Sequence, residues 1–132
     1  MSDWNAPIIE EFRANGGRVE QFGDHLVLLH TTGAKSGKER VNPLAYQPDG
    51  DRIVVFASKA GAPTNPDWFH NVLANPQVQV ETGSETYAAV ARVAEGEERE
   101  RLWARQKELM PGFADYEAAT TRQIPVVILE RT

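Results

Sequence analysis

Residues 25–37 carry the sequence His25-Leu-Val-Leu-Leu-His-Thr-Thr32 followed by Gly33-Ala-Lys-Ser-Gly37. The first part is a continuous apolar and β-branched run, which is typical of a strand that is buried on both faces. The glycine-bounded part ends that strand, and strand-like residues resume at Arg40. This stretch therefore predicts a buried strand followed by a tight loop, and its neighbours along the chain decide how the sheet is completed.

Outward from this stretch, strand-like runs alternate with turns and short helical segments. An Asp-Gly turn at 49–50 and a turn at 82–84 predict two antiparallel hairpins. This pattern predicts an α+β fold, an antiparallel sheet or small barrel of about six strands with flanking helices, rather than a parallel doubly wound sheet. The predicted strands are residues 25–32, 40–46, 52–57, 78–80, 87–93 and 125–130, and the predicted helices lie within 1–17, 66–75, 95–110 and 114–120.

Two of these helices have apolar residues at helical spacing. In the middle helix, Trp68, Val72 and Leu73 share a face. In the charged helix 95–110, the inward stripe is expected to contain Leu102, Trp103, Gln106 and Leu109.

The composition limits the function classes. The 132 residues predict one domain over residues 1–132, with 41% hydrophobic residues and no cysteine, which fits a reducing compartment. A net charge of −5 without any Lys/Arg run argues against nucleic-acid binding. The N-terminus resembles no signal peptide, and no apolar run approaches the length that spans a membrane. We expect a cytoplasmic protein with no nucleic-acid partner and no stable membrane insertion.

The loop from Gly33 to Arg40 concentrates positive charge. Lys35, Lys38 and Arg40 are opposed only by Glu39, so a local charge of +2 stands on an acidic chain. The loop is not a P-loop, because three residues rather than four separate its glycines and Glu39 occupies the Ser/Thr position. Two interpretations stay open from spacing alone, which are an anion site and an ordinary solvated hairpin loop.

No self-sufficient catalytic machinery stands out. His25 and His30 face opposite sides of one strand, and His70 has only Asp67 one turn away. No histidine spacing fits a metal, and no Gly-x-Ser-x-Gly elbow is present, so we expect no metal site. A cofactor that brings its own chemistry would explain this pattern.

Several ordered blocks resemble one family. They are His30-Thr-Thr-Gly-Ala-Lys-Ser-Gly-Lys-Glu-Arg-Val-Asn-Pro-Leu44 and residues 57–71, 74–80 and 116–125. Together, from about Leu26 to the C-terminus, they are similar to the deazaflavin-dependent nitroreductase family of actinobacteria and relatives. The resemblance implies a split β-barrel and hydride transfer from reduced coenzyme F-420 to a quinone, an activated alkene or a nitroaromatic.

The resemblance also implies site residues. F-420 carries a phosphodiester and a polyglutamate tail. Lys35 and Arg40 match family positions that hold these two groups, and Lys38 is implied as a further contact. Ser58 matches a position near the ring and substrate, where Ser58 or Tyr116 is expected to donate a proton or hold the acceptor oxygen, unless solvent does so. The implied coenzyme contacts are Lys35, Ser36, Lys38, Arg40, Asn42, Pro43, Ser58, Lys59, Ala60, Gly61, Asn65, Trp68 and Asn71.

The implied substrate wall departs from the nitroimidazole-reducing members. Those members carry tyrosines where this chain has Ala45, Met110 and Phe113, and only Tyr116 keeps its hydroxyl. The resemblance therefore implies a more apolar pocket that suits bicyclic nitro drugs poorly. An alternative from another class is a non-catalytic carrier of F-420, FMN, haem or a lipid on the same barrel. A homodimer is compatible with such barrels, although no sequence feature decides it.

Overall fold

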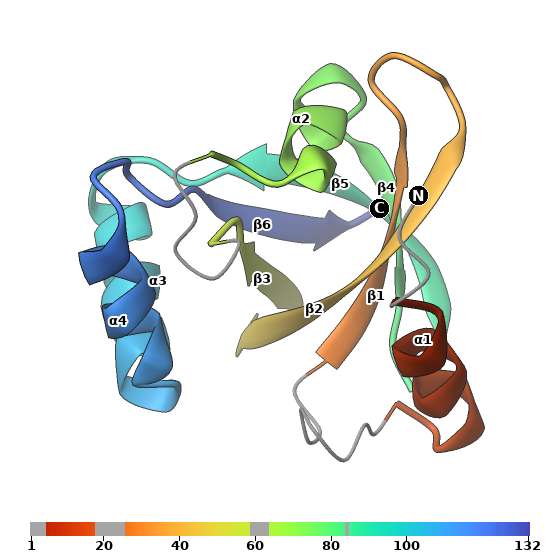
Figure 1. Ribbon diagram of the computed structural model, residues 1–132, viewed down its shortest axis with the longest axis horizontal. Helices are drawn as coiled ribbons and strands as arrows, with labels where there is room; N and C mark the ends of the chain where they lie inside the picture. Colours follow the sequence, from red (N-terminus) through yellow and green to blue (C-terminus); the bar gives the residue numbers. More distant parts are fainter. Residues whose placement is uncertain (1–4, 18–25, 59–63, 84) are drawn as a thin grey trace.

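The computed structural model describes residues 5–17, 26–58, 64–83 and 85–132. Its centre is a closed barrel in the order β1-β2-β3-β6-β5-β4, in which all neighbouring strands are antiparallel (Figure 1). The α+β class and the six strands predicted from the sequence are confirmed. The strands are β1 Leu26–Thr32, β2 Glu39–Asp49, β3 Arg52–Phe56, β4 Gln77–Glu81, β5 Thr86–Val93 and β6 Val126–Arg131.

Both predicted hairpins are present. β2 and β3 pair from Asp49↔Arg52 to Tyr46↔Val55, and Gly50 in the turn has a φ of 65°, a left-handed conformation that favours glycine. β4 and β5 pair from Glu81↔Thr86 to Gln77↔Val90. β2 extends three residues beyond its predicted end at Tyr46, because the turn is tight enough for pairing to continue to Asp49.

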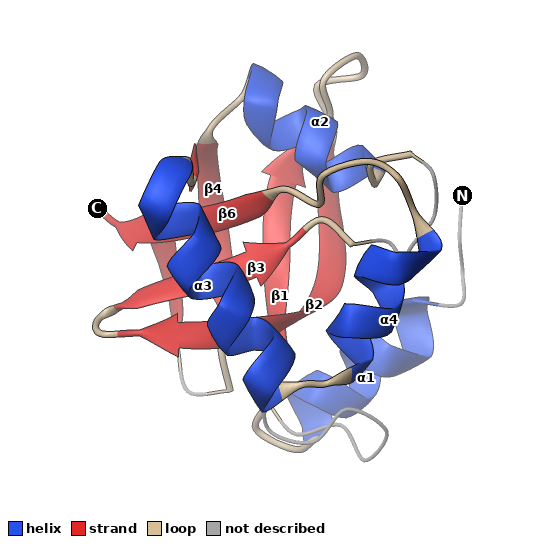
Figure 2. Cartoon of the chain, turned by 90° about the vertical axis from the view of Figure 1, so that its left-hand side faces the viewer, coloured by secondary structure: helices blue, strands red, loops and turns tan. Residues whose placement is uncertain are grey.

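Four helices flank the barrel in the described chain. They are α1 Asn5–Ala14, α2 Asp67–Ala74, α3 Gly96–Leu109 and α4 Gly112–Ala119. Figure 2 shows α2 at one end of the barrel, α3 and α4 on one side, and α1 behind them. None of these helices has the length and apolar character needed to span a membrane.

Two apolar residues singled out on the helices are exposed. Leu109 on α3 was predicted to face inward and is 52% exposed, so that prediction was wrong. Leu73 on α2, which shares a helical face with Trp68 and Val72 in the sequence pattern, is 57% exposed. Each helix contacts the barrel over a narrower face than the apolar pattern suggests. In α2 that face consists of Trp68, Phe69 and Val72.

The barrel interior forms the largest core. Alternate residues of the strands point inward, among them Val27, Val55 and Leu129, which are at most 1% exposed. The buried face of α2 closes one end of this core, with Trp68 4% exposed and packed edge-on against Phe69. Trp68 therefore belongs to the barrel's hydrophobic core.

Two smaller cores lie on the outer face of the barrel. One packs Ile8 and Phe12 of α1 against β1, as the predicted N-terminal helix requires. The other packs α3 and α4 against the outward residues of β3 and β6, including Phe56 and Trp103. This second outer core fixes α4, which carries Phe113 and Tyr116, and α3, which ends directly before Met110.

Charged side chains hold the closed end of the β2–β3 hairpin to the neighbouring strands and α3. Arg52 contacts Asp49, Glu98 and Glu130, and Arg92 contacts the same two glutamates at 2.8 and 3.2 Å. Hydrogen bonds from Arg52 lower the pKa of Asp49, and those from Arg92 lower the pKa of Glu98 and Glu130.

This network predicts a loss of stability in acid. A carboxyl whose pKa is lower in the folded state stabilises the fold above its unfolded pKa, about 4 for Asp and Glu, and stops doing so as pH falls through the folded value. The melting temperature should therefore hold from about pH 7 to 5 and fall below about pH 4. Arg92→Met should flatten that fall when thermal unfolding is followed by circular dichroism across pH. An unchanged pH slope in the variant would contradict the network's role.

Candidate cofactor site

β2 and β3 separate partway along the barrel. Their ladder ends at Tyr46↔Val55, whereas β2 stays paired with β1 as far as Thr32↔Glu39. Extending the β2–β3 register by three residues would bring Pro43 opposite Ser58, but pairing has already stopped. Proline has no N–H to donate to a ladder, so Pro43 suits this unpaired stretch. Two candidate coenzyme contacts, Pro43 and Ser58, thus lie where the strands diverge.

The β1–β2 hairpin carries the basic loop, and backbone hydrogen bonds shape its tip. The Gly33 N–H donates to the Lys38 carbonyl at 2.8 Å, and the Gly37 N–H donates to the Gly33 carbonyl at 3.0 Å. The Ser36 hydroxyl accepts from the Lys38 N–H at 3.2 Å. Ser36 is therefore part of the turn, which presents the basic side chains around it.

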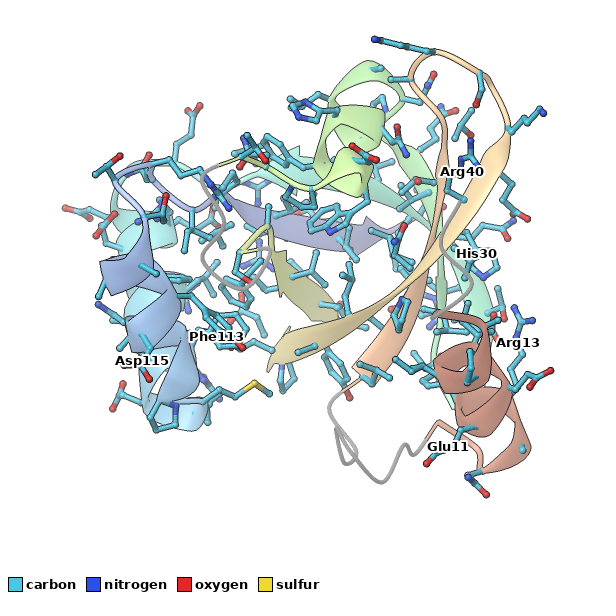
Figure 3. All side chains as sticks on the ribbon, in the orientation of Figure 1. Glu11, Arg13, His30, Arg40, Phe113 and Asp115 are labelled. Carbon is cyan, nitrogen blue, oxygen red and sulfur yellow. The ribbon has the colours of Figure 1, made fainter. Side chains whose placement is uncertain are left out.

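The cations of this hairpin have no carboxylate partners in the described chain. Lys35, Lys38 and Arg40 are all exposed, and none forms a side-chain hydrogen bond or ion pair with a described residue. Figure 3 shows Arg40 on the extended part of β2, towards the hairpin. By contrast, seven other cations of the described chain form ion pairs with Asp or Glu side chains: Arg13, Arg52, Arg92, Arg99, Arg101, Lys107 and Arg131. The hairpin therefore offers positive charge to an external anion.

Asn71 of α2 supports the base of this hairpin. Its Oδ1 accepts from the Ala34 N–H at 2.9 Å, and its Nδ2 donates to Thr31 Oγ1 at 3.1 Å. The side chain is 7% exposed. Asn71, expected as a direct coenzyme contact, uses these groups to fix Thr31 and Ala34 at the base of the hairpin.

Replacing Asn71 by alanine should loosen the hairpin and lower stability. The change leaves the Ala34 N–H and the Thr31 hydroxyl without partners, which costs about 1–3 kcal/mol of unfolding free energy. Urea unfolding measures this cost. Asn75→Ala is the matched control, because the Asn75 amide reaches the Thr32 carbonyl only at 3.5 Å. Equal losses in the two variants would contradict a specific role for Asn71.

The four expected substrate-wall residues lie on the outer side of the barrel. The Phe113 ring packs against Phe56 and Tyr116, with centroid separations of 5.8 and 5.1 Å. Figure 3 shows Phe113 between α4 and the barrel. The Phe113 N–H donates to the Met110 carbonyl at 3.0 Å, which fixes Met110 beside α4.

A buried amide chain links β2 to the same wall. Gln47 Nε2 donates to the Leu102 carbonyl and to Gln106 Oε1, and Gln106 Nε2 lies 3.3 Å from Met110 Sδ. Ala45 lies two residues before Gln47 on β2, so both lie on the same face of that strand. Sequence analysis missed Gln47, which is fully buried and has no charge to mark it.

The remaining predicted contacts differ in their surroundings. Asn42 is half-buried on β2, and Ser58 is 8% exposed just after β3. Asn65 is half-buried, and its Oδ1 accepts from Arg122 at 2.7 Å. Lys59, Ala60 and Gly61 lie outside the described residues. Sequence analysis gave Arg122 no role, although it belongs to one of the resembling blocks.

Two surface hollows lie elsewhere on the molecule. The described residues line one hollow at the N-terminus of α3, around Arg99 and Gln123, and another around His30 and Val90. They contain no group of three or more side chains suited to hold a metal ion. The wall is defined by its side chains and by the diverging strands.

These features define a split barrel with a cationic hairpin suited to an anionic ligand. A sequence profile described as F420H(2)-dependent quinone reductase matches residues 6–131. The chain belongs to this family, which confirms the resemblance to deazaflavin-dependent enzymes.

Individual relatives and solved structures are similar to this chain as well. The chain is 39% identical over 108 residues to an F420H(2)-dependent quinone reductase of Mycobacterium tuberculosis, covering 80% of this chain and 72% of the relative. A solved F420-H2 dependent reductase superimposes with a TM-score of 0.74 at 45% identity, covering 80% of this chain and 94% of that one. A structure described as a domain-swapped dimer gives a TM-score of 0.77 at 40% identity, covering 97% and 98%. The haem storage protein HutZ of Vibrio cholerae, at 20% identity and a TM-score of 0.63, covers 96% and 89% and shares the fold alone.

Proposed function

We propose that this protein transfers hydride from reduced coenzyme F-420 to a small electrophile, with quinones as the first substrate class. The observation that carries this proposal is the group of exposed cations, Lys35, Lys38 and Arg40, that have no carboxylate partner in the described chain. An acidic protein gains little from leaving such charges together unless an anion joins them. The phosphodiester and glutamate tail of F-420 supply that anion.

The hairpin would hold the coenzyme by its charged end. Hydrogen bonds to charged groups contribute about 1.5–3 kcal/mol each, and less where solvent screens them. Arg40 can bind a phosphate with two N–H groups, whereas Lys35 and Lys38 act as point charges. Asn71 supports this grip by fixing Thr31 and Ala34 at the base of the hairpin.

The ring would lie along the diverging strands, near Pro43 and Ser58. When bound, reduced F-420 supplies the hydride. The chain's contribution is to orient the reactants and to exclude water with the apolar wall that contains Phe113 and Met110. Ser58 Oγ and Tyr116 Oη are the candidate groups to hold the acceptor oxygen or to deliver its proton.

Assembly and location form a further part of the proposal. A homodimer is supported by the related structure described as a domain-swapped dimer, which spans almost the whole chain. A cytoplasmic location is favoured by the absence of cysteine. Activity on enones and nitroaromatics is expected to be weaker than on quinones, because the family description names quinones.

Steady-state turnover tests this function. The purified chain should oxidise reduced F-420 when menadione is added. Reduced FMN, which lacks the glutamate tail, should not support this turnover when it is supplied in place of reduced F-420. A chain that binds F-420 but shows no acceptor-dependent oxidation would be a carrier. Equal turnover with FMN would contradict the role assigned to the hairpin.

A further inference from the structure

Arg122 joins the segment before β6 to the residues that follow β3. Its Nη1 donates to the Ala57 carbonyl at 3.1 Å and to Asn65 Oδ1 at 2.7 Å, and its Nη2 donates to the Ser58 carbonyl at 2.9 Å. These partners lie 57 to 65 positions away in the sequence. Figure 2 shows the connection from α4 to β6 running beside the one that leaves β3. One guanidinium therefore fixes both Ser58 and Asn65.

Backbone hydrogen bonds on both sides of Arg122 fix its position. Its backbone N–H donates to Thr120 Oγ1 at 3.3 Å, directly after α4. Three residues later, the Pro125 carbonyl accepts from the Ala57 N–H at 3.0 Å, which extends the β3–β6 pairing beyond Phe56↔Val126. The arginine thus stands between the helix that carries Tyr116 and the strand end that carries Ser58.

The Arg122 guanidinium is partly removed from water at this position. The side chain is part-buried, and burial lowers the pKa of the Arg122 guanidinium from its ordinary value. Three of its partners are the neutral oxygens of Ala57, Ser58 and Asn65, arranged to match the planar fork of a guanidinium. A lysine at this position keeps the charge but cannot reach all three oxygens with one planar group.

We propose that Arg122 is a positioning residue of the coenzyme site, acting through Ser58 and Asn65. The inference rests on the proposed function, because it assigns these two residues to the ring end of F-420. It separates two parts of the site: the hairpin cations grip the charged tail, whereas Arg122 sets the geometry around the ring. Losing Arg122 should therefore weaken the binding of any deazaflavin, with or without a tail.

The experiment compares two probes, which are full F-420 and the tail-less deazaflavin nucleoside without phosphate or glutamates. Fluorescence titration of each gives its Kd for the wild type, Arg122→Lys, Arg122→Gln and Lys35→Ala. Arg122→Gln should raise both Kd values by about tenfold, and Arg122→Lys by about threefold, with little dependence on salt. Lys35→Ala should raise the Kd of full F-420 alone.

Arg99 provides the matched control. It is a buried arginine whose Nη2 donates to the Ile124 carbonyl at 2.7 Å, so it anchors the same connection from the α3 side. Arg99→Gln should lower the melting temperature without changing either Kd, whereas the Arg122 variants should change both Kd values well below their melting temperatures. This comparison separates positioning from a general loss of stability.

The outcomes are distinguishable. If the wild type binds both probes and Arg122→Lys, which keeps the charge and the fold, binds them with unchanged Kd, the inference is overturned and the proposed function stands. A raised Kd for full F-420 only would assign Arg122 to the tail and would also overturn it. If the wild type binds neither probe, the proposed function fails together with the inference.

Discussion

Replacing Lys35 and Arg40 together by alanine should raise the Kd for coenzyme F-420 by about 30- to 150-fold at low ionic strength. Both side chains are exposed, so solvent screening should reduce each contact to about 1–1.5 kcal/mol, at or below the low end for a charged hydrogen bond. Neither cation pairs with a described carboxylate, and therefore removing them breaks no described ion pair. The melting temperature should change little.

Fluorescence titration at several salt concentrations measures this effect. The wild-type Kd should rise steeply with salt, and the double variant should lose most of that dependence. Arg105→Ala is the matched control, because Arg105 is another exposed cation, on α3. If Arg105→Ala weakens binding as much as the double variant does, general electrostatic attraction and not the hairpin accounts for the affinity.

Replacing Trp103 by alanine should cost about 3–5 kcal/mol of unfolding free energy, the range for large aromatic side chains in cores. Trp103 is 2% exposed, and its ring lies near Phe56 and Phe113, with centroids at 5.9 and 6.2 Å. Its Nε1 donates to Glu117 at 2.7 Å, which ties α3 to α4. The variant loses the outer core that holds Phe113 in place.

Urea unfolding measures this cost, and Leu109→Ala is its control. Leu109 lies on the same helix but is 52% exposed, so its loss should change stability by less than about 0.5 kcal/mol. If the two variants are equally stable, α3 does not pack on the barrel through Trp103.

The strands could be predicted from sequence because their signals are local. In β4, Val78 and Val80 alternate with polar residues and are buried as expected. The Asp49-Gly50 turn identified the β2–β3 hairpin in the same way. Leu109 was wrongly assigned to the inward face of α3, because the apolar spacing along a helix does not say how wide the face is that contacts the barrel.

The candidate site could likewise be predicted only where its signals are local in the sequence. The hairpin cations could be found from sequence, since Lys35, Lys38 and Arg40 lie within six residues and charge needs no partner to be counted. The supporting roles could not. Asn71 bonds residues 37 and 40 positions earlier in the chain, and Arg122 bonds residues at least 57 positions earlier. Such pairs meet only after the barrel has closed.

The most direct test of the central claim is a single turnover. The chain is mixed with one equivalent of reduced F-420 at low salt, menadione is added, and the return of the oxidised deazaflavin is followed by its fluorescence. The account predicts a rapid oxidation that depends on the protein and slows when Lys35 and Arg40 are both alanine. Oxidation at the same rate with and without the protein would contradict it.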